Sequence, residues 1–268
     1  MANKDYDFPP VIEVSMAVYF KELPFLNNIN LAARAFELRE KFGMTRIDQT
    51  LYVDTRPEGE ARPPLNQFNI HQGVQKVGVL MSSSDGTRRV SFQDNRFYYS
   101  WNKESDSEYP RYESIKKDFF ELYDIFCNAV PALGIINADI VQAGIGYINL
   151  IPDDDAKGYQ NLNLVSLDKF REHEELHLHT RQRLTHSEEV GRLYLTLDTL
   201  FHFEGNPESG LLEEKRKLKY GLVFRGKPSS QKISETEAFF NRGRKAIIDT
   251  FSQSLSDIGR QTFKEKDI

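Results

Sequence analysis

Apolar residues recur at every second position over several stretches of this chain, and this alternation predicts β-strands. In the first stretch, 11–20, one face would carry only apolar residues: Ile12, Val14, Met16, Val18 and Phe20. The same reasoning predicts strands at 46–53, 74–81, 87–93, 139–151, 190–203 and 218–225. Segment 139–151 is almost wholly apolar, so we expect a central strand. Its Gly144 and Gly146 would let a helix or a ligand approach closely.

A period close to 3.6 residues predicts three long helices, at 28–43, 110–131 and 234–258. Pro110 suits the first turn of the second helix, and segment 234–237 has the spacing of a capping box. Glycines at 43 and 259 are placed to end the first and third helices. The buried stripes of the three helices would contain Leu31, Ala35, Leu38 and Phe42; Ile115, Phe119, Leu122 and Phe126; and Phe240, Ile247, Phe251, Leu255 and Ile258.

Residues 87–101 have the pattern of a β-hairpin with a two-residue turn at Asp94-Asn95. This turn would place three pairs opposite each other: Phe92 and Phe97, Val90 and Tyr99, and Arg88 and Trp101. The aromatic side would then face the core. We interpret the other side as the solvated face of an antiparallel sheet, carrying Arg89, Ser91, Gln93, Arg96, Tyr98 and Ser100.

Together these elements predict an α+β fold, a mostly antiparallel sheet with about three long helices packed on it. The first half follows a split β-α-β, ferredoxin-like order with extra hairpin strands. We expect an N-terminal α+β unit at 9–151 and a C-terminal α+β unit at 152–268, packed as one globular body. The order of elements is also compatible with a loose duplication of two lobes.

The composition limits where the chain works and what it binds. Its 268 residues carry a net charge of −5, which disfavours extended, sequence-independent nucleic-acid binding but leaves a local basic face open. Cys127 is the single cysteine, which excludes an internal disulfide and suits a reducing compartment. The chain begins without a signal-peptide pattern and contains no apolar run of membrane-spanning length. We therefore expect a cytoplasmic protein without membrane contact.

Segment 173–177, His-Glu-Glu-Leu-His, has the spacing of a zinc hydrolase, in which two histidines bind the metal and the glutamate activates water. Its flanks are charged, however, and the third-ligand pattern that extends this motif is absent. From 176 to 181 leucine and threonine alternate with histidine and arginine, which predicts a strand. A polar strand or loop is therefore the favoured interpretation. The alternative is zinc bound by His173 and His177, with Glu174 as the catalytic residue.

Arginine and tyrosine gather in and after the hairpin, and both types contribute strongly to binding at interfaces. They could also stack on bases and pair with phosphates. The candidate binding face contains Arg89, Gln93, Arg96, Tyr98, Tyr109, Arg111 and Tyr112. A solvated sheet face with tyrosines at its rim is the simpler interpretation, and we favour it for the hairpin.

Four stretches occur in a distinctive order: PPVIEV at 9–14, SFQDNRFYYSWN at 91–102, YPRY at 109–112 and GYIN at 146–149. Over these roughly 150 residues the chain resembles a sporadically distributed prokaryotic family of uncharacterised proteins of about this length. Gly146 stands where that family typically has an arginine, so the resemblance implies no role for that arginine here. A sporadic distribution implies carriage beside mobile or defence-associated genes.

The resemblance favours a non-catalytic binding or partner protein of a prokaryotic accessory system. Such a protein would act through a protein partner or as a homo-oligomer, without a cofactor. The alternatives that the residues leave open are a zinc-dependent hydrolase and a nucleotide or nucleic-acid binder, of which nucleic acid is not favoured.

Overall fold

The computed structural model describes residues 4–7, 9–51, 77–104, 107–128, 136, 138–152, 161–163, 177–186, 189–205, 212–230 and 232–267. Within these residues the fold is α+β with a mostly antiparallel sheet, as the sequence predicts. The chain divides into two compact units. Unit 1 contains Met1–Val14, Gly144–Arg225 and Ala238–Ile268, and unit 2 contains Ser15–Ala143 and Gly226–Glu237. The division into 9–151 and 152–268 stays a prediction, because compactness alone does not define a folding domain.

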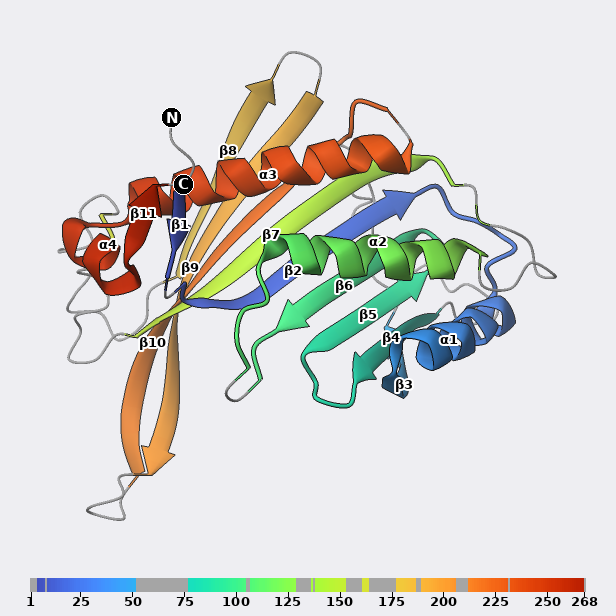
Figure 1. Cartoon of the computed structure of the whole chain (residues 1–268), viewed down its shortest axis with the longest axis horizontal. Coiled ribbons are helices and arrows are strands. Elements are labelled where there is room, and N and C mark those ends of the chain that lie inside the picture. Colours follow the sequence, from blue (N-terminus) through green and yellow to red (C-terminus); the bar gives the residue numbers. More distant parts are fainter. Residues whose placement is uncertain are drawn as a thin grey trace, which may run out of the picture. The chain divides into compact units, whose positions relative to one another are not determined.

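Unit 2 contains helices α1 (Asn28–Phe42) and α2 (Tyr112–Asn128) and strands β3 (Met44–Leu51), β4 (Val77–Ser83), β5 (Arg88–Gln93) and β6 (Arg96–Asn102). It also contains most of β2 (Val11–Phe20). The strand order is β3-β4-β5-β6-β2, and both helices lie on one side of these strands (Figure 1). Gly43 ends α1 with a φ of 63°, the left-handed stop that the sequence predicts. The split β-α-β, ferredoxin-like description of this half stays a prediction.

The hairpin of β5 and β6 has the predicted register. Phe92 pairs with Phe97, Val90 with Tyr99, and Arg88 with Trp101. The apolar members of these pairs are all buried. The residues of the turn and the alternation of apolar and polar positions were therefore enough to predict the register of the hairpin and the side that faces the core.

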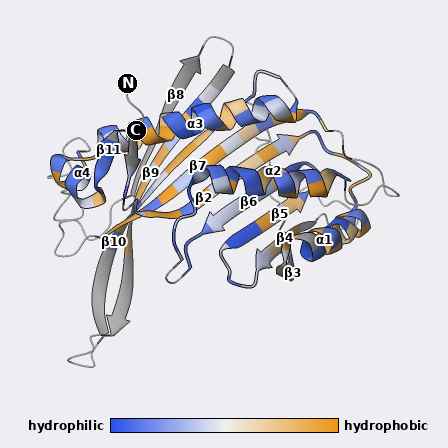
Figure 2. Cartoon of the chain, in the orientation of Figure 1, coloured by the Kyte–Doolittle hydropathy of each residue, from blue (hydrophilic) through white to orange (hydrophobic). Residues whose placement is uncertain are grey.

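An aromatic cluster between the hairpin and α2 forms the core of unit 2. The ring of Phe97 lies 5.8 Å from that of Phe119, 5.4 Å from that of Tyr123 and 5.1 Å from that of Phe126. The predicted stripe of α2 is buried, and Figure 2 shows hydrophobic and hydrophilic residues alternating along this helix. Edge-to-face and tilted ring pairs add to the stabilisation from burial, by about 0.5–1.5 kcal/mol each.

Unit 1 contains strands β7 (Ile140–Pro152, shared with unit 2), β8 (His177–His186), β9 (Glu189–Gly205) and β10 (Leu212–Gly226), in the order β2-β7-β10-β9-β8. A separate antiparallel pair joins β1 (Lys4–Tyr6) to β11 (Glu265–Asp267). Helix α3 (Ile233–Ser254) packs against β10, where the Phe224 ring lies 5.1 Å from that of Phe239. The hydroxyl groups of Tyr220 and Ser254 are 2.8 Å apart in this core.

The third predicted helix ends earlier than the sequence suggests. Helix α3 stops at Ser254, and a separate helix, α4 (Asp257–Phe263), follows. The reason is Ser256, whose Oγ accepts a hydrogen bond from the backbone N–H of Gly259 and so caps a new helix. Ile258 consequently lies in α4 and is 52% exposed, so its assignment to the buried stripe was wrong. Gly259 is not a helix stop. A Cβ there would lie 2.3 Å from the Asn161 carbonyl oxygen, so the position requires glycine.

The two units share part of their strand order. β2 lies beside β6, the last strand before α2, and β7 lies beside β10, the last strand before α3. This likeness agrees with the loose duplication that the order of predicted elements allowed. It also means that β5–β6 and β9–β10 occupy corresponding places in their units.

No helix in the described part of the chain is long and apolar enough to cross a membrane.

Candidate functional site

Six side chains of β5 and β6 point away from the aromatic core, and we call this set the hairpin face: Arg89, Ser91, Gln93, Arg96, Tyr98 and Ser100. The sequence predicts a solvated face, but Gln93 and Ser100 are each only 2% exposed. The other four side chains are half-buried. Both buried side chains have polar partners close by, since Gln93 Nε2 donates a hydrogen bond of 2.7 Å to Asn95 Oδ1 and Asn102 Nδ2 donates one of 2.9 Å to Ser100 Oγ. The hairpin face is therefore packed more closely than expected.

Arg96 and Tyr98 form a stacked pair on the hairpin face. The guanidinium carbon of Arg96 lies 4.7 Å from the centroid of the Tyr98 ring, which is cation–π geometry. Arg96 Nε is buried, and this atom has no hydrogen-bond partner among the described residues. The pair thus places a positive charge and an aromatic ring together at a half-buried position of the sheet.

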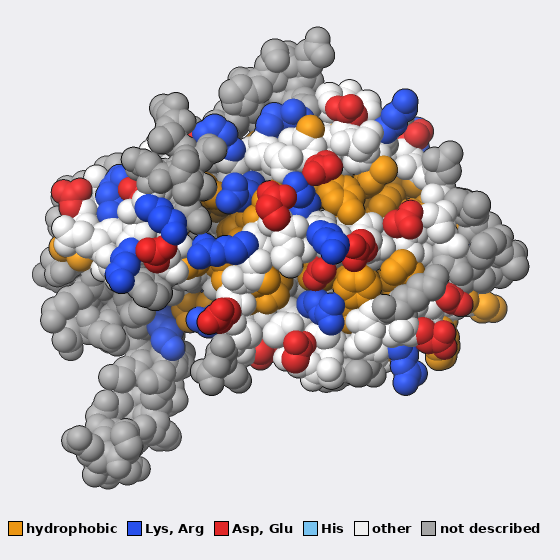
Figure 3. Space-filling model, viewed as in Figure 1, with side chains coloured by type: hydrophobic (Ala, Val, Ile, Leu, Met, Phe, Trp, Pro, Cys, Tyr) orange, Lys and Arg blue, Asp and Glu red, His pale blue; other side chains and the backbone are white. Residues whose placement is uncertain are grey.

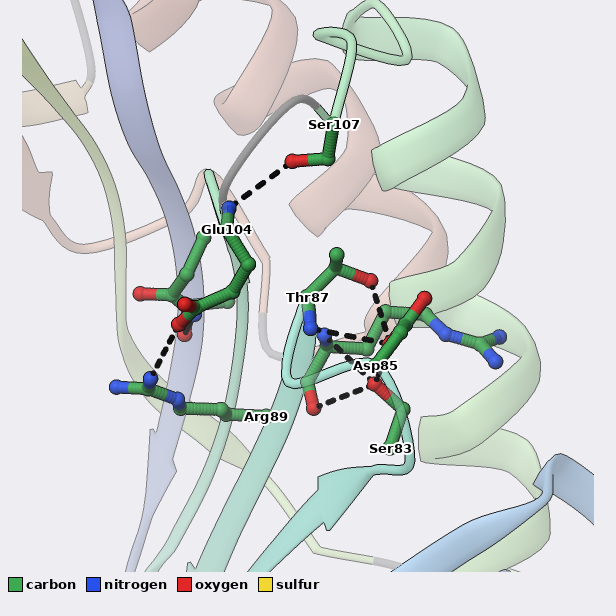
Figure 4. A network of polar contacts seen from close by, with 9 residues as sticks. Ser83, Asp85, Thr87, Arg89, Glu104 and Ser107 are labelled. Atoms are coloured by element: carbon green, nitrogen blue, oxygen red, sulfur yellow. Dashed lines mark hydrogen bonds and ion pairs between the residues drawn. The ribbon is translucent and has the colours of Figure 1, made fainter.

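Arg89, at the other end of the hairpin face, is neutralised. Its Nη2 lies 3.0 Å from Glu104 Oε1, and both side chains are 44% exposed (Figure 4). The backbone of Glu104 is held in turn, since its N–H donates a hydrogen bond of 2.9 Å to Ser107 Oγ. An ion pair this exposed contributes little stability, but it cancels the charge that Arg89 would otherwise offer to a ligand.

The turn between β4 and β5 is built around Asp85, which the sequence analysis did not single out. Asp85 Oδ1 accepts hydrogen bonds from Ser83 Oγ at 2.5 Å, from the Thr87 N–H at 3.1 Å and from Thr87 Oγ1 at 2.9 Å (Figure 4). The Ser83 hydrogen bond, followed by those from Thr87, lowers the pKa of the Asp85 carboxyl group. The spacing Ser-x-Asp-x-Thr is a turn signature, so the sequence did contain the signal for this site.

The remaining predicted binding residues do not lie on the hairpin face. Tyr109 packs on Trp101, with ring centroids 5.5 Å apart, and the guanidinium carbon of Arg111 lies 5.8 Å from the Tyr109 ring. Trp101 is a core residue of β6, so this second cluster belongs to the helix side of the sheet at the start of α2. Tyr112 is only 3% exposed. The structure thus divides the seven candidates into two groups.

Arg111 itself has an unusual backbone. Its φ is 69°, in the left-handed region that side-chain-bearing residues rarely adopt. The side chain is exposed. Backbone strain of this kind costs about 1–3 kcal/mol and is found more often at functional sites.

A buried tyrosine joins the hairpin to α2. The hydroxyl of Tyr99, a fully buried residue, donates a hydrogen bond of 2.9 Å to Asp118 Oδ2. Burial, and then the negative charge of Asp118, raise the pKa of Tyr99. A tyrosine that remains neutral over the physiological range acts here as a structural donor rather than as a proton carrier.

The structure describes only part of the zinc-hydrolase candidate. His177 is the first residue of β8 and pairs with Asp198 of β9, so the strand predicted around 177–181 is present. His173 and Glu174 lie outside the described residues. Among the residues that are described, no group of three or more histidine, cysteine, aspartate and glutamate side chains is arranged to hold a metal ion.

Cys127 is buried, and desolvation raises the pKa of its thiol to about 12. A nucleophilic cysteine needs a lowered pKa, because the thiolate is the reactive form. Cys127 therefore has the properties of a core residue in α2.

Comparison with models of known protein families gives no match, and comparison with curated proteins gives none either.

Proposed function

We propose that this chain is a binding or partner protein of a prokaryotic accessory system and performs no covalent chemistry itself. The observation that carries the proposal is the stacked pair of Arg96 and Tyr98 on the hairpin face. Arginine and tyrosine are the residue types that most often dominate the energy of protein–protein interfaces. A half-buried pair also loses little side-chain entropy when a partner covers it, because stacking already restricts both side chains.

The partner that fits the hairpin face is a protein with hydrogen-bond acceptors and an apolar or aromatic anchor. Arg89 is paired with Glu104, and the remaining members of this face, apart from Arg96, carry no charge. A nearly neutral face offers little to a polyanion. It suits a partner whose acceptors reach the Arg96 guanidinium, which would gain a charge-assisted hydrogen bond.

The helix side of unit 2 is less suited to this role. Over α2, charged side chains of both signs are interspersed (Figure 3). Lys116 lies 2.8 Å from Glu113 and 2.9 Å from Glu237, and Lys117 lies 3.7 Å from Glu121. Such paired, mixed charge is typical of a solvated helix surface.

The test begins with capture of the tagged chain at native level from its own host, followed by mass spectrometry. Any stoichiometric protein is then purified, and its Kd is measured by calorimetry against the wild type and an Arg96→Ala, Tyr98→Ala variant. We expect the double variant to weaken binding by about 30-fold, the loss of one strong interface contact. Arg39→Ala, which removes an exposed arginine of α1, is the matched control and should leave the Kd unchanged.

Self-association is measured separately by sedimentation of the purified chain, since a second copy could be the partner. The proposal fails if no stoichiometric protein is captured and the chain stays monomeric up to about 100 μM, a concentration at which weak specific interfaces form. It also fails for the hairpin face if the double variant binds a captured partner as tightly as the wild type.

A further inference from the structure

Helix α1 exposes apolar side chains on the side that faces away from the core of unit 2. Within the described residues six large apolar side chains are exposed, and three of them lie in α1 or in the turn before it: Phe25 at 40%, Ile29 at 78% and Phe36 at 58%. Figure 3 shows hydrophobic side chains at the surface over α1. Exposed apolar residues are therefore concentrated at this helix.

These side chains form a single stripe along the helix together with two alanines, and we call this set the outer stripe: Phe25, Ile29, Ala32, Ala33 and Phe36. Ile29 and Phe36 are seven residues apart, so they lie on nearly the same line along the helix. Phe25 is fixed beside the first turn, because Asn30 Nδ2 donates a hydrogen bond to its carbonyl oxygen. The outer stripe thus runs from the turn before α1 to the second half of the helix.

The outer stripe takes no part in the core of unit 2. Leu31, Ala35 and Leu38, which are buried in that core, lie on the opposite side of α1. A helix with apolar residues on two opposite sides is normally covered on both. Single exposed apolar residues are common, whereas a continuous group marks an interaction site. The surface of α2 differs, because it carries paired charges of both signs.

We propose that the outer stripe is the interface of a homodimer in which two α1 helices pack antiparallel. The stripe is self-complementary about a two-fold axis that passes between Ala32 and Ala33. Ile29 of one copy would lie opposite Phe36 of the second copy, and the alanines of both copies would meet at the centre. Large side chains at both ends and small ones at the crossing point let two helices approach closely.

The charges of α1 favour the same arrangement. The first turn of α1 contains no acidic residue, so no carboxylate of its own helix offsets the partial positive charge at this end. Glu40, in the last turn, is exposed and lies close to the line of Ile29 and Phe36, whereas Arg39 lies about 100° around the helix from Glu40. Antiparallel packing places Glu40 of one copy near the N-terminal end of α1 in the other. Parallel packing would place the two Glu40 side chains together. This complementarity favours a second copy over an unrelated partner.

The size of the outer stripe predicts a weak dimer. At their observed exposure, Phe25, Ile29 and Phe36 offer about 300 Å² of surface per copy, or about 600 Å² in a dimer. Stable interfaces bury about 1,200–2,000 Å² in total. We therefore expect a reversible dimer with a Kd of about 10–100 μM. The inference does not rest on the partner proposal, because the hairpin face points away from the side of the sheet that the helices cover.

The first test is analytical ultracentrifugation of the full chain from about 5 to 300 μM, a range that brackets this Kd. Phe36→Glu should raise the Kd by at least about tenfold, because its carboxylate would be buried against Ile29 of the second copy. Ile258→Glu is the matched control, since Ile258 in α4 is exposed to a similar degree, 52%, and should leave the Kd unchanged. The Arg96→Ala, Tyr98→Ala variant should dimerise like the wild type, which separates this inference from the hairpin face.

Cysteine cross-linking tests the antiparallel register. Ile29→Cys and Phe36→Cys are purified separately, and a short bis-maleimide is added to each variant and to their mixture. The mixture should form covalent dimers and neither variant alone should, because identical positions would lie about 10 Å apart along the helix axis. The wild type shows whether Cys127 contributes, and we expect no reaction there because this thiol is buried.

Four results would overturn the inference. The first is a chain that stays monomeric up to about 300 μM. The second is a dimer that Phe36→Glu leaves intact, which would locate the interface elsewhere. The third is cross-linking within a single variant that equals cross-linking in the mixture, which would exclude the antiparallel register. The fourth is a monomeric chain that loses a captured protein partner through Phe36→Glu, since the outer stripe would then belong to that partner. The cross-linking pattern decides even if Phe36→Glu fails to fold.

Discussion

Arg34 of α1 donates a hydrogen bond of 2.6 Å from its Nη1 to the carbonyl oxygen of Phe126 near the end of α2. The same nitrogen lies 3.2 Å from the carbonyl oxygen of Cys127, and the guanidinium carbon is 5.8 Å from the Phe126 ring. Arg34 has no exposed surface, and burial lowers its pKa. The last carbonyl groups of a helix lack intrahelical partners and carry a partial negative charge. Arg34 thus caps α2 from a neighbouring helix.

Arg34→Met should destabilise the protein markedly. Methionine fills much of the space but removes the donor of the buried Phe126 carbonyl, whereas the Cys127 carbonyl keeps its hydrogen bond from the Ile136 N–H. We therefore expect a loss of about 1–3 kcal/mol in the free energy of unfolding. The measurement is urea unfolding followed by circular dichroism. Arg39→Met on the exposed side of α1 is the matched control and should cost under about 0.5 kcal/mol. Equal midpoints for the two variants would contradict the capping role.

Phe224 requires glycine at position 191. A Cβ on Gly191 would lie 2.1 Å from Phe224 Cζ, whereas a Cβ on Gly144 would meet nothing closer than 3.6 Å. Gly191→Ala should therefore destabilise the protein by about 1–3 kcal/mol through overpacking, and Gly144→Ala by much less. Adding Phe224→Leu to Gly191→Ala should recover part of the loss. A double-mutant cycle from urea unfolding measures this coupling, and strictly additive effects would exclude it.

The sequence allowed much of unit 2 to be predicted, because its signals are local. The Asp94-Asn95 turn set the register of β5 and β6, and the 3.6-residue period located α1 and α2. The end of α3 could not be predicted in the same way. Its stop depends on a cap at Ser256 and on the contact between Gly259 and Asn161, two residues far apart in the sequence.

The candidate site was predictable in composition but not in arrangement. Arg96 and Tyr98 alternate with core residues, so their common face followed from the strand period. The ion pair between Arg89 and Glu104 could not be predicted. It depends on the path of the chain after β6, and no periodic pattern in the sequence specifies that path.

Asp85→Ala should loosen the turn between β4 and β5. Loss of the acceptor for Ser83 Oγ and for the Thr87 N–H should cost about 1 kcal/mol at pH 7. The pKa of Asp85 is lowered in the folded state, so its contribution is present above the ordinary pKa of a carboxyl group and is lost as the pH falls below it. The difference in unfolding free energy between wild type and variant should accordingly shrink from pH 6 towards pH 3. A constant difference would show that the carboxylate charge is not involved.

Tyr220→Phe should make the protein less sensitive to alkali. The buried Tyr220 has its pKa raised to about 12 by desolvation, against 10.0 for an ordinary tyrosine. A raised pKa gives stability that is complete below pH 10 and is lost as the pH rises towards 12, because the unfolded chain releases the proton first. Between pH 8 and pH 11 the wild type should lose about 1.4 kcal/mol more than the variant. Urea unfolding at the two pH values measures this difference between the two losses. The other buried tyrosines are present in both proteins, so their contributions to the difference cancel. Loss of the contact with Ser254 lowers the stability of the variant at both pH values and leaves the comparison intact. Identical alkaline losses in the two proteins would show that Tyr220 ionises as readily when folded as when unfolded.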